Sequence, residues 1–295
     1  LWLAVWFVLF MPLVSLAALV EQKTVSLPST ILNEYAVLAD NAYAGTSTLY
    51  LRAPSSTTLP MAAPQVSALE PGDLLLVVQM QGAKIKDAAD NATYGEVVSY
   101  GSAGLYEFIR VKSFDPQTGM VTLNTDCGGL KNSYVSGGHA QVLRVPEYTN
   151  LTIDVNGSVV APAWNGELGG IVAIRAKSLL LQGKVDVSGK GFRGGRLHQG
   201  GLSAQQDMLM YRSTNPQSGA EKGEGVAGFY VEYDMLGGRY GRGAAANGGG
   251  GGNGFNASGG GGANGNNGRL WTGFGVMDDG GGIYMDAWKK DPRYQ

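Results

Sequence analysis

The chain has 295 residues, among them 22 Lys and Arg, 24 Asp and Glu, 47 Gly, two His and one Cys. The net charge of −2, with no basic cluster, leaves nothing to neutralise a phosphate backbone, which argues against nucleic acid as a partner. Cys127 has no second cysteine to pair with, and no Cys or His spacing suits zinc. We therefore expect no intrachain disulfide, no metal and no other cofactor, in one large or two ordinary domains.

The first 20 residues carry no charge. Small residues at Ser15 and Ala17 fit the pattern that precedes signal-peptidase cleavage, and Pro12 would disturb a spanning helix. We predict a signal peptide over residues 1–18 and export to the extracellular space or the cell surface. The alternative is a retained anchor, because 20 apolar residues can cross a bilayer, and the membrane would then be contacted only through this segment.

Between residues 27 and 145, short β-prone runs alternate with turn residues, and no stretch keeps apolar residues at helical spacing for long. A Pro-Gly-Asp turn at 71–73 precedes the apolar run 74–80. Two further runs, 106–114 and 120–124, flank the turn sequence Asp-Pro-Gln-Thr-Gly and predict a hairpin. The expected fold class is mostly β, beginning with an antiparallel barrel-like or sandwich-like domain.

Runs with glycine turns follow more closely between residues 146 and 188. Two segments look alike, LTIDVNGSVV from Leu151 and LLLQGKVDVSG from Leu179, and each indicates a strand, a turn with glycine and a second strand. Stacked about 4.8 Å apart, such units would form rungs of a short β-solenoid. The strands predicted between residues 140 and 188 are 141–145, 151–155, 159–161, 171–174, 179–181 and 185–187.

Residues 189–282 form a glycine-rich region with 31 of the 47 glycines, and residues 283–295 are interpreted as a truncated continuation. Each ordered glycine costs about 0.5–1 kcal/mol relative to alanine, so a folded region needs compensating contacts. We expect main chains that approach too closely for a Cβ, as in polyproline-II-like helices. The alternative is a partly disordered linker, although low charge and interspersed aromatic residues are untypical of disorder.

The dinucleotide-binding pattern G-x-G-x-x-G occurs four times, starting at Gly189, Gly223, Gly249 and Gly260. A tract so rich in glycine produces such matches by chance. The upstream strands also lack the crossover helices of a βαβ unit. Nucleotide binding is therefore not expected.

Two aspartates are the candidate catalytic residues. Asp154 and Asp186 occupy similar places in the two look-alike segments, and stacked segments would bring them to one face. Glycosidases place the scissile bond between two such acids. A polar, outward position in an alternating strand accounts for both aspartates without catalysis.

Aromatic residues beside Asn and Gly are the candidate ligand contacts. A flat apolar ring meets the C–H face of a pyranose while neighbouring amides bind its hydroxyls. The residues concerned are Trp164, Trp271, Tyr240 and Phe255. The alternative for tryptophans in such places is that they cap a core.

Four segments in order resemble a known kind of protein: VLRVPEYTNLTI from Val142, APAWNGELGGIVAI from Ala161, VDVSGKGFRGG from Val185 and KGEGVAG from Lys222. Followed by a Gly/Asn tract, they are similar to glycine-rich, adhesin-like secreted or surface proteins of environmental bacteria. The resemblance covers roughly residues 74–268 and implies export, with no catalytic or ligand residue carried over. The glycine tract alone is also similar in composition to the extracellular domain of some animal receptor kinases.

The sequence thus favours a secreted or cell-surface structural or adhesive protein. Its low-charge β and glycine-rich surface would contact glycans, a matrix or other copies of itself. The alternative is a polysaccharide-active β-solenoid lyase or hydrolase that uses Asp154 and Asp186.

Overall fold

The computed structural model describes residues 20–52, 65–66, 68–91, 93–125, 128–197 and 210–251. This part of the chain is mostly β, as predicted, with thirteen strands and one α-helix, α1 (Tyr230–Met235). None of its helices is long and apolar enough to cross a membrane. The segments predicted as signal peptide, 1–18, and as continuation, 283–295, lie outside the described residues.

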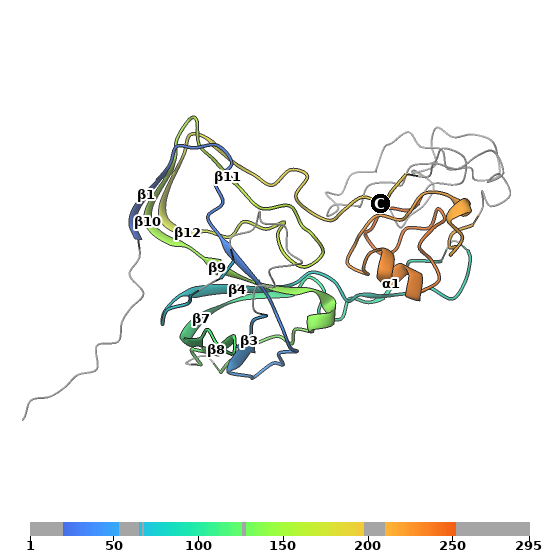
Figure 1. The fold of residues 1–295 in the computed structure, drawn as a ribbon, viewed down its shortest axis with the longest axis horizontal. Helices are drawn as coiled ribbons and strands as arrows, with labels where there is room; N and C mark the ends of the chain where they lie inside the picture. Colours follow the sequence, from blue (N-terminus) through green and yellow to red (C-terminus); the bar gives the residue numbers. More distant parts are fainter. Residues whose placement is uncertain are drawn as a thin grey trace, which may run out of the picture.

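Six strands form one antiparallel sheet, and its two edge strands meet through a bridge between Leu38 and Leu51, so that the sheet is curled (Figure 1). In sheet order the strands are β2 (Glu34–Val37), β9 (Ala140–Val145), β4 (Leu74–Gln79), β7 (Tyr106–Asp115), β8 (Met120–Leu123) and β3 (Thr48–Tyr50). The predicted hairpin is confirmed, because β7 pairs with β8 around the expected turn.

Alternating side chains give this sheet two apolar faces. The inner face carries the larger core, which includes the fully buried Leu75, Val77 and Val121. The outer face of the sheet packs against Leu168 and Ala173 of a later loop. Both faces of part of the sheet are therefore buried, which explains the continuous apolar run of β4.

Three parallel strands form a separate stack, and they lie side by side at the opposite end of the molecule from α1 (Figure 1). They are β1 (Val20–Val25), β10 (Glu147–Ile153) and β12 (Arg175–Leu181). Beyond a turn, β11 (Ser158–Val160) pairs in parallel with β13 (Lys184–Asp186), and Thr30 bridges Val159. The curled sheet is thus inserted in the chain between the first and second strands of the stack.

The two look-alike segments pair in register, with Leu151 opposite Leu179 and Val159 opposite Val185. The predicted stacking of these units is therefore present in the structure. The sequence did not predict that β1, more than 120 residues earlier, would supply a third strand. The sequence of this strand, VEQKTV, has too weak an apolar pattern to be recognised alone.

The predicted strand at 171–174 is wrong. This segment is irregular, and its main chain is bonded to side chains in place of a neighbouring strand. The buried Asn33 amide accepts from Ala173 N at 3.0 Å and donates to Ala173 O at 2.6 Å, while Tyr35 donates its hydroxyl proton to Ile171 O at 2.7 Å. These side-chain hydrogen bonds take the place of the backbone hydrogen bonds that a neighbouring strand would provide to Ile171 and Ala173.

Glycines in the turns of the stack lie against the main chain of the preceding strand layer. A Cβ at Gly157 would collide with the carbonyl oxygen of Val25, and one at Gly183 would collide with the carbonyl oxygens of Gly157 and Asp154. The chain could not close these turns at this spacing with any side chain present. Glycine is therefore required by contact between neighbouring backbones.

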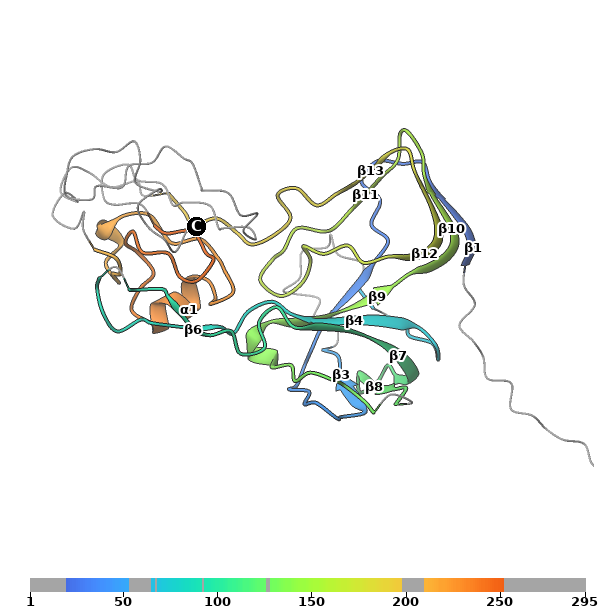
Figure 2. The same cartoon turned by 180° about the vertical axis from the view of Figure 1, so that it is seen from behind.

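Residues 210–251 of the glycine-rich region, which we call the glycine-rich unit, fold around α1 and pack against a hairpin that extends from the curled sheet. The hairpin consists of β5 (Lys84–Ile85) and β6 (Val97–Ser99), and Figure 2 shows β6 beside α1. Their shared core contains the fully buried Tyr94 and Tyr233 together with Ala245. The glycine-rich unit therefore shares its core with residues far earlier in the chain.

Close backbone contacts also explain glycines in this unit. A Cβ at Gly225 would lie 2.5 Å from Gly248 N, and one at Gly248 would lie 2.6 Å from Gly223 O. A Cβ at Gly251 would collide with Ala220 O. The main chain runs in turns and irregular segments around these contacts, together with α1 and a short 3-10 helix, Pro216–Ser218.

Candidate functional site

Two exposed aromatic rings lie on the outer face of the curled sheet. Tyr106 and Phe108 are 62% and 53% exposed, and their ring centroids lie 6.4 Å apart in an edge-to-face arrangement. They pair across the ladder with Val78 and Leu76, which belong to the outer-face core. The rings therefore extend an apolar face into solvent and are held by the part of β7 that pairs with β4.

Arg110 continues the same face two residues along β7 and leads into a cluster of charges. Its guanidinium forms a bidentate pair with Glu147, which also accepts from Arg175 at 2.8 Å. Hydrogen bonds from Arg110, followed by the positive charges of both arginines, hold the pKa of Glu147 below its usual range. We call Tyr106, Phe108, Arg110, Glu147 and Arg175 the β7 strip.

The β7 strip combines the two elements of carbohydrate recognition. Exposed rings can stack on the apolar face of a sugar, and guanidinium groups donate to hydroxyls or carboxylates. No group of three or more His, Cys, Asp or Glu side chains that could hold a metal occurs in the described residues. The arrangement is therefore suited to binding a ligand through stacking and hydrogen bonds.

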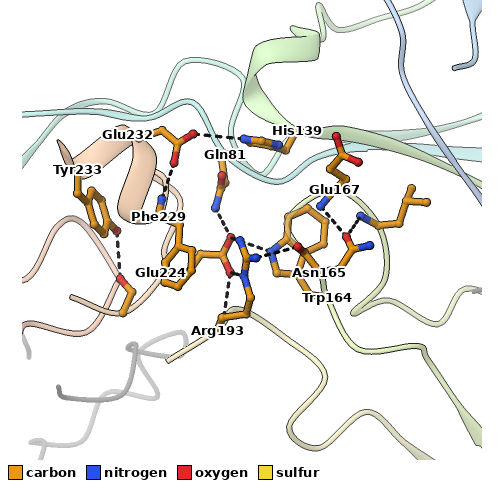
Figure 3. A network of polar contacts seen from close by, with 12 residues as sticks. Gln81, His139, Trp164, Asn165, Glu167, Arg193, Glu224, Phe229, Glu232 and Tyr233 are labelled. Carbon is orange, nitrogen blue, oxygen red and sulfur yellow. Dashed lines mark hydrogen bonds and ion pairs between the residues drawn. The ribbon is translucent and has the colours of Figure 1, made fainter. Parts of the chain in front are cut away.

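Trp164, a predicted ligand contact, is buried, so its ring lacks the exposure that this prediction assumes. The side chain is 3% exposed, packs edge-to-face on Phe192 at 6.1 Å and donates its indole N–H to Glu224 at 2.8 Å (Figure 3). Tryptophan in this place closes a core, which is the simpler of the two interpretations of the sequence. Its amphipathic ring fits because a buried carboxylate accepts its one donor.

Glu224 is the centre of the network in Figure 3 and ties three parts of the chain together. One carboxylate oxygen accepts from Trp164, from Gln81 at 2.9 Å and from Arg193 at 3.0 Å. The other accepts from the main-chain and side-chain nitrogens of Arg193, both at 2.9 Å. Five hydrogen bonds to a buried carboxylate leave it fully engaged, so this network is structural.

Tyr240, another predicted ligand contact, is half-buried. Its backbone pairs with Ser213, with hydrogen bonds of 3.0 and 2.9 Å, and its ring lies under Arg239 at 5.5 Å. Arg239 also lies over Tyr230 at 4.9 Å and forms an ion pair with Glu221. Phe255 and Trp271, the remaining predicted contacts, lie outside the described residues.

The register of the stack separates the two candidate catalytic aspartates. Asp154 follows β10 and accepts from Asn156 N and Gly157 N in its own turn, whereas Asp186 lies in β13 opposite Val160 and accepts from Ser188 N. Hydrogen bonds lower the pKa of both groups, that of Asp186 to about 2. Neither carboxyl has the raised pKa of a general acid.

The β7 strip could not be recognised from the sequence, because the alternation of residue types in β7 is ambiguous. Tyr106, Phe108 and Arg110 share one face, whereas Glu107 and Ile109 share the other. The buried Glu107 points inward, where it accepts from Lys131 N at 2.9 Å, Asn132 N at 3.0 Å and the Tyr134 hydroxyl at 3.1 Å. A buried glutamate and exposed aromatics reverse the usual expectation for a strand.

No protein-family model and no curated protein matches the chain. Three solved structures are similar to part of it. The Gp54 tailspike of Acinetobacter baumannii bacteriophage AP22, in complex with A. baumannii capsular saccharide, is 11% identical over 56% of this chain and 28% of its own, with a TM-score of 0.24. The Gp61 tailspike of Pseudomonas phage phi297 is 13% identical over 57% and 23%, with a TM-score of 0.24.

The third is the Gp49 tailspike of Pseudomonas phage LKA1, which is 11% identical over 46% of this chain and 22% of its own, with a TM-score of 0.22. The chain therefore matches between 22% and 28% of the length of these tailspikes. TM-scores this low establish neither a common fold nor a common function.

Proposed function

We propose that this is an exported structural protein of the cell surface or extracellular space that contacts glycans through the β7 strip. The observation that carries the proposal is the exposed Tyr106–Phe108 pair on β7, which pairs with β4 at these residues in a sheet with a well-packed core. Two rings fixed in this way lose little conformational entropy when a ligand covers them. Binding through such a face requires no cofactor.

The charges beside the rings favour a saccharide that carries hydroxyl or carboxylate groups. Arg175 is the most exposed of the three charged residues in the strip, and its side chain is 62% accessible. Glu147 fixes the positions of Arg110 and Arg175, because both guanidinium groups bind the same carboxylate. The strip thus presents two exposed rings next to a pair of guanidinium groups held by one carboxylate.

Electrophoresis through gels that contain soluble polysaccharides tests the proposal. Polysaccharide should retard the wild-type protein, and Tyr106→Ala with Phe108→Ala should weaken retention by about tenfold or more, equivalent to about 1.4 kcal/mol. Tyr43→Ala is the matched control, since Tyr43 is 61% exposed and lies outside the strip. Equal retention of the double variant and the wild type would disprove this role of the rings.

The enzyme alternative makes a different prediction. An enzyme that used Asp154 and Asp186 would release sugar from a polysaccharide and lose that activity when both are changed to Asn. A binding protein would release none, and the same double change would leave retention in the gel unaltered. Both side chains are engaged in local turns, so this result would agree with their geometry.

A further inference from the structure

The last strand layer of the parallel stack has an apolar edge that none of the described strands covers. Equivalent positions in consecutive layers differ sharply in exposure: Leu151 is 2% exposed and its ladder partner Leu179 is 55% exposed. Val159 is fully buried, whereas its partner Val185 is 44% exposed. Apolar side chains at equivalent ladder positions therefore continue into β12 and β13, and in this last layer they are about half exposed.

The opposite edge of the stack is different. Lys23 of β1 occupies the ladder position of Leu151, and Pro28 follows the strand. A charge and a proline are the usual means by which proteins prevent a further strand from pairing at an edge. β12 instead carries Leu179, Leu180 and Leu181 in succession, all at least half exposed.

The turn geometry specifies what could stack on the open edge. Gly157 lies against a carbonyl of the first layer, and Gly183 lies against carbonyls of the second layer. A further layer at the same spacing would need glycine at the corresponding turn. It would also need apolar residues opposite Leu179, Leu181 and Val185. In the existing ladders these three residues lie opposite Leu151, Ile153 and Val159.

We propose that the β12–β13 edge is a docking surface for one further parallel strand from a partner polypeptide. The partner strand has the pattern apolar-x-apolar-x-Gly-x-apolar and carries no charge at the apolar positions. The partner strand would continue the β10–β12 ladder, in which Leu151 and Ile153 of β10 are already paired and buried. The β1 strand of a second copy does not fit, because Lys23 would lie over Leu179.

A synthetic peptide with the sequence of residues 178–187, SLLLQGKVDV, is a suitable probe, since it carries the required pattern. Fluorescence anisotropy with the full chain should show binding of the labelled peptide. Leu181→Lys in the protein should weaken it by about tenfold or more. Val155→Lys is the control, because Val155 is 75% exposed but lies in the turn before β11. A peptide with Ala in place of its glycine should also bind about tenfold more weakly.

Hydrogen exchange on the wild-type protein gives a second readout that needs no variant to fold. Added peptide should slow exchange at amides of β12 and leave those of β8 unchanged. Absence of peptide binding, or binding that Leu181→Lys does not weaken, would overturn the proposal. A homodimer of the wild type that Leu181→Lys abolishes would also overturn it, because the occupant would then be a second copy. Slow exchange of the β12 amides in the free chain would overturn it as well, because the edge would then already be covered.

Discussion

Gly183 lies directly against the carbonyl oxygen of Gly157, so that two successive layers of the parallel stack touch main chain to main chain. The next contact in the same direction is between Gly157 and the carbonyl oxygen of Val25. Neither glycine has a positive φ, so the need for glycine comes from space and not from backbone conformation. These glycine contacts connect the end of β1 with the turns that follow β10 and β12, the two stack strands that come after the inserted sheet.

Replacement of Gly183 by alanine should destabilise the stack. The new methyl group would overlap backbone atoms that cannot rotate away, and overpacking of this kind costs about 1–3 kcal/mol. Urea unfolding measures the effect. Gly194→Ala is the control, since a Cβ there meets nothing within 4 Å and should change stability by less than about 0.5 kcal/mol. Equal stabilities of the two variants would contradict the contact.

Trp164→Phe should lower stability without affecting glycan retention. The change removes the indole donor from the buried Glu224 carboxylate, and such a loss costs about 1–3 kcal/mol. Thermal unfolding measures the loss, and affinity electrophoresis measures retention. If the variant kept its stability but lost retention, Trp164 would be a ligand contact after all.

Backbone amides in the described glycine-rich unit should exchange far more slowly than those of an unfolded peptide. Gly223 N donates to Gly249 O at 2.8 Å, Arg242 N to Met210 O at 2.9 Å and Ala246 N to Gly95 O at 2.9 Å. These bonds protect amides only if the close packing persists in solution. Exchange at random-coil rates for all three amides would show that the unit is a flexible linker.

The stability of the same unit should depend on pH through Lys222. Its ammonium is buried, donates to Tyr211 O at 2.8 Å and Gly241 O at 3.1 Å, and lies 4.8 Å from the Tyr94 ring. Burial is the main cause that lowers its pKa from 10.5 to about 7. Between these values the unfolded chain binds more protons than the folded one, so stability rises with pH.

Unfolding of the wild type and of Lys222→Met between pH 7 and 9.5 isolates this contribution. The free energy of unfolding of the wild type should increase relative to that of the variant as the pH rises. The range ends below the pKa of Tyr94, which burial raises to about 12, so that tyrosine ionisation in the fold does not interfere. A constant difference across the range would contradict a lowered pKa for Lys222.

Local patterns in the sequence sufficed for several elements. The turn at residues 115–119 predicted the β7–β8 hairpin, because the Asp115 carboxylate accepts from Gln117 N and from the Thr118 hydroxyl within that turn. The repeat around Leu151 and Leu179 predicted two stacked segments, because paired strands in a parallel ladder need similar side chains at equivalent positions. In the first case the information lies within one turn, and in the second it lies in two similar short segments.

Features that depend on distant residues could not be predicted in this way. The pairing of β1 with β10 joins Lys23 to Leu151 across the inserted sheet. The irregular segment near Ala173 is held by Asn33, 140 residues away, and the outward position of Tyr106 depends on inward bonds to Glu107. Such contacts leave no periodic trace in one sequence, so the candidate site was found only from the structure.

The most direct test of glycan contact is to observe the rings themselves. NMR spectra of protein with isotope-labelled Tyr and Phe rings can be recorded during titration with an oligosaccharide from a polysaccharide that retards the protein. The ring signals of Tyr106 and Phe108 should shift together and saturate at one affinity, while that of Tyr43 stays unchanged. Saccharide binding that leaves both of the β7 ring signals unmoved would contradict the proposed function.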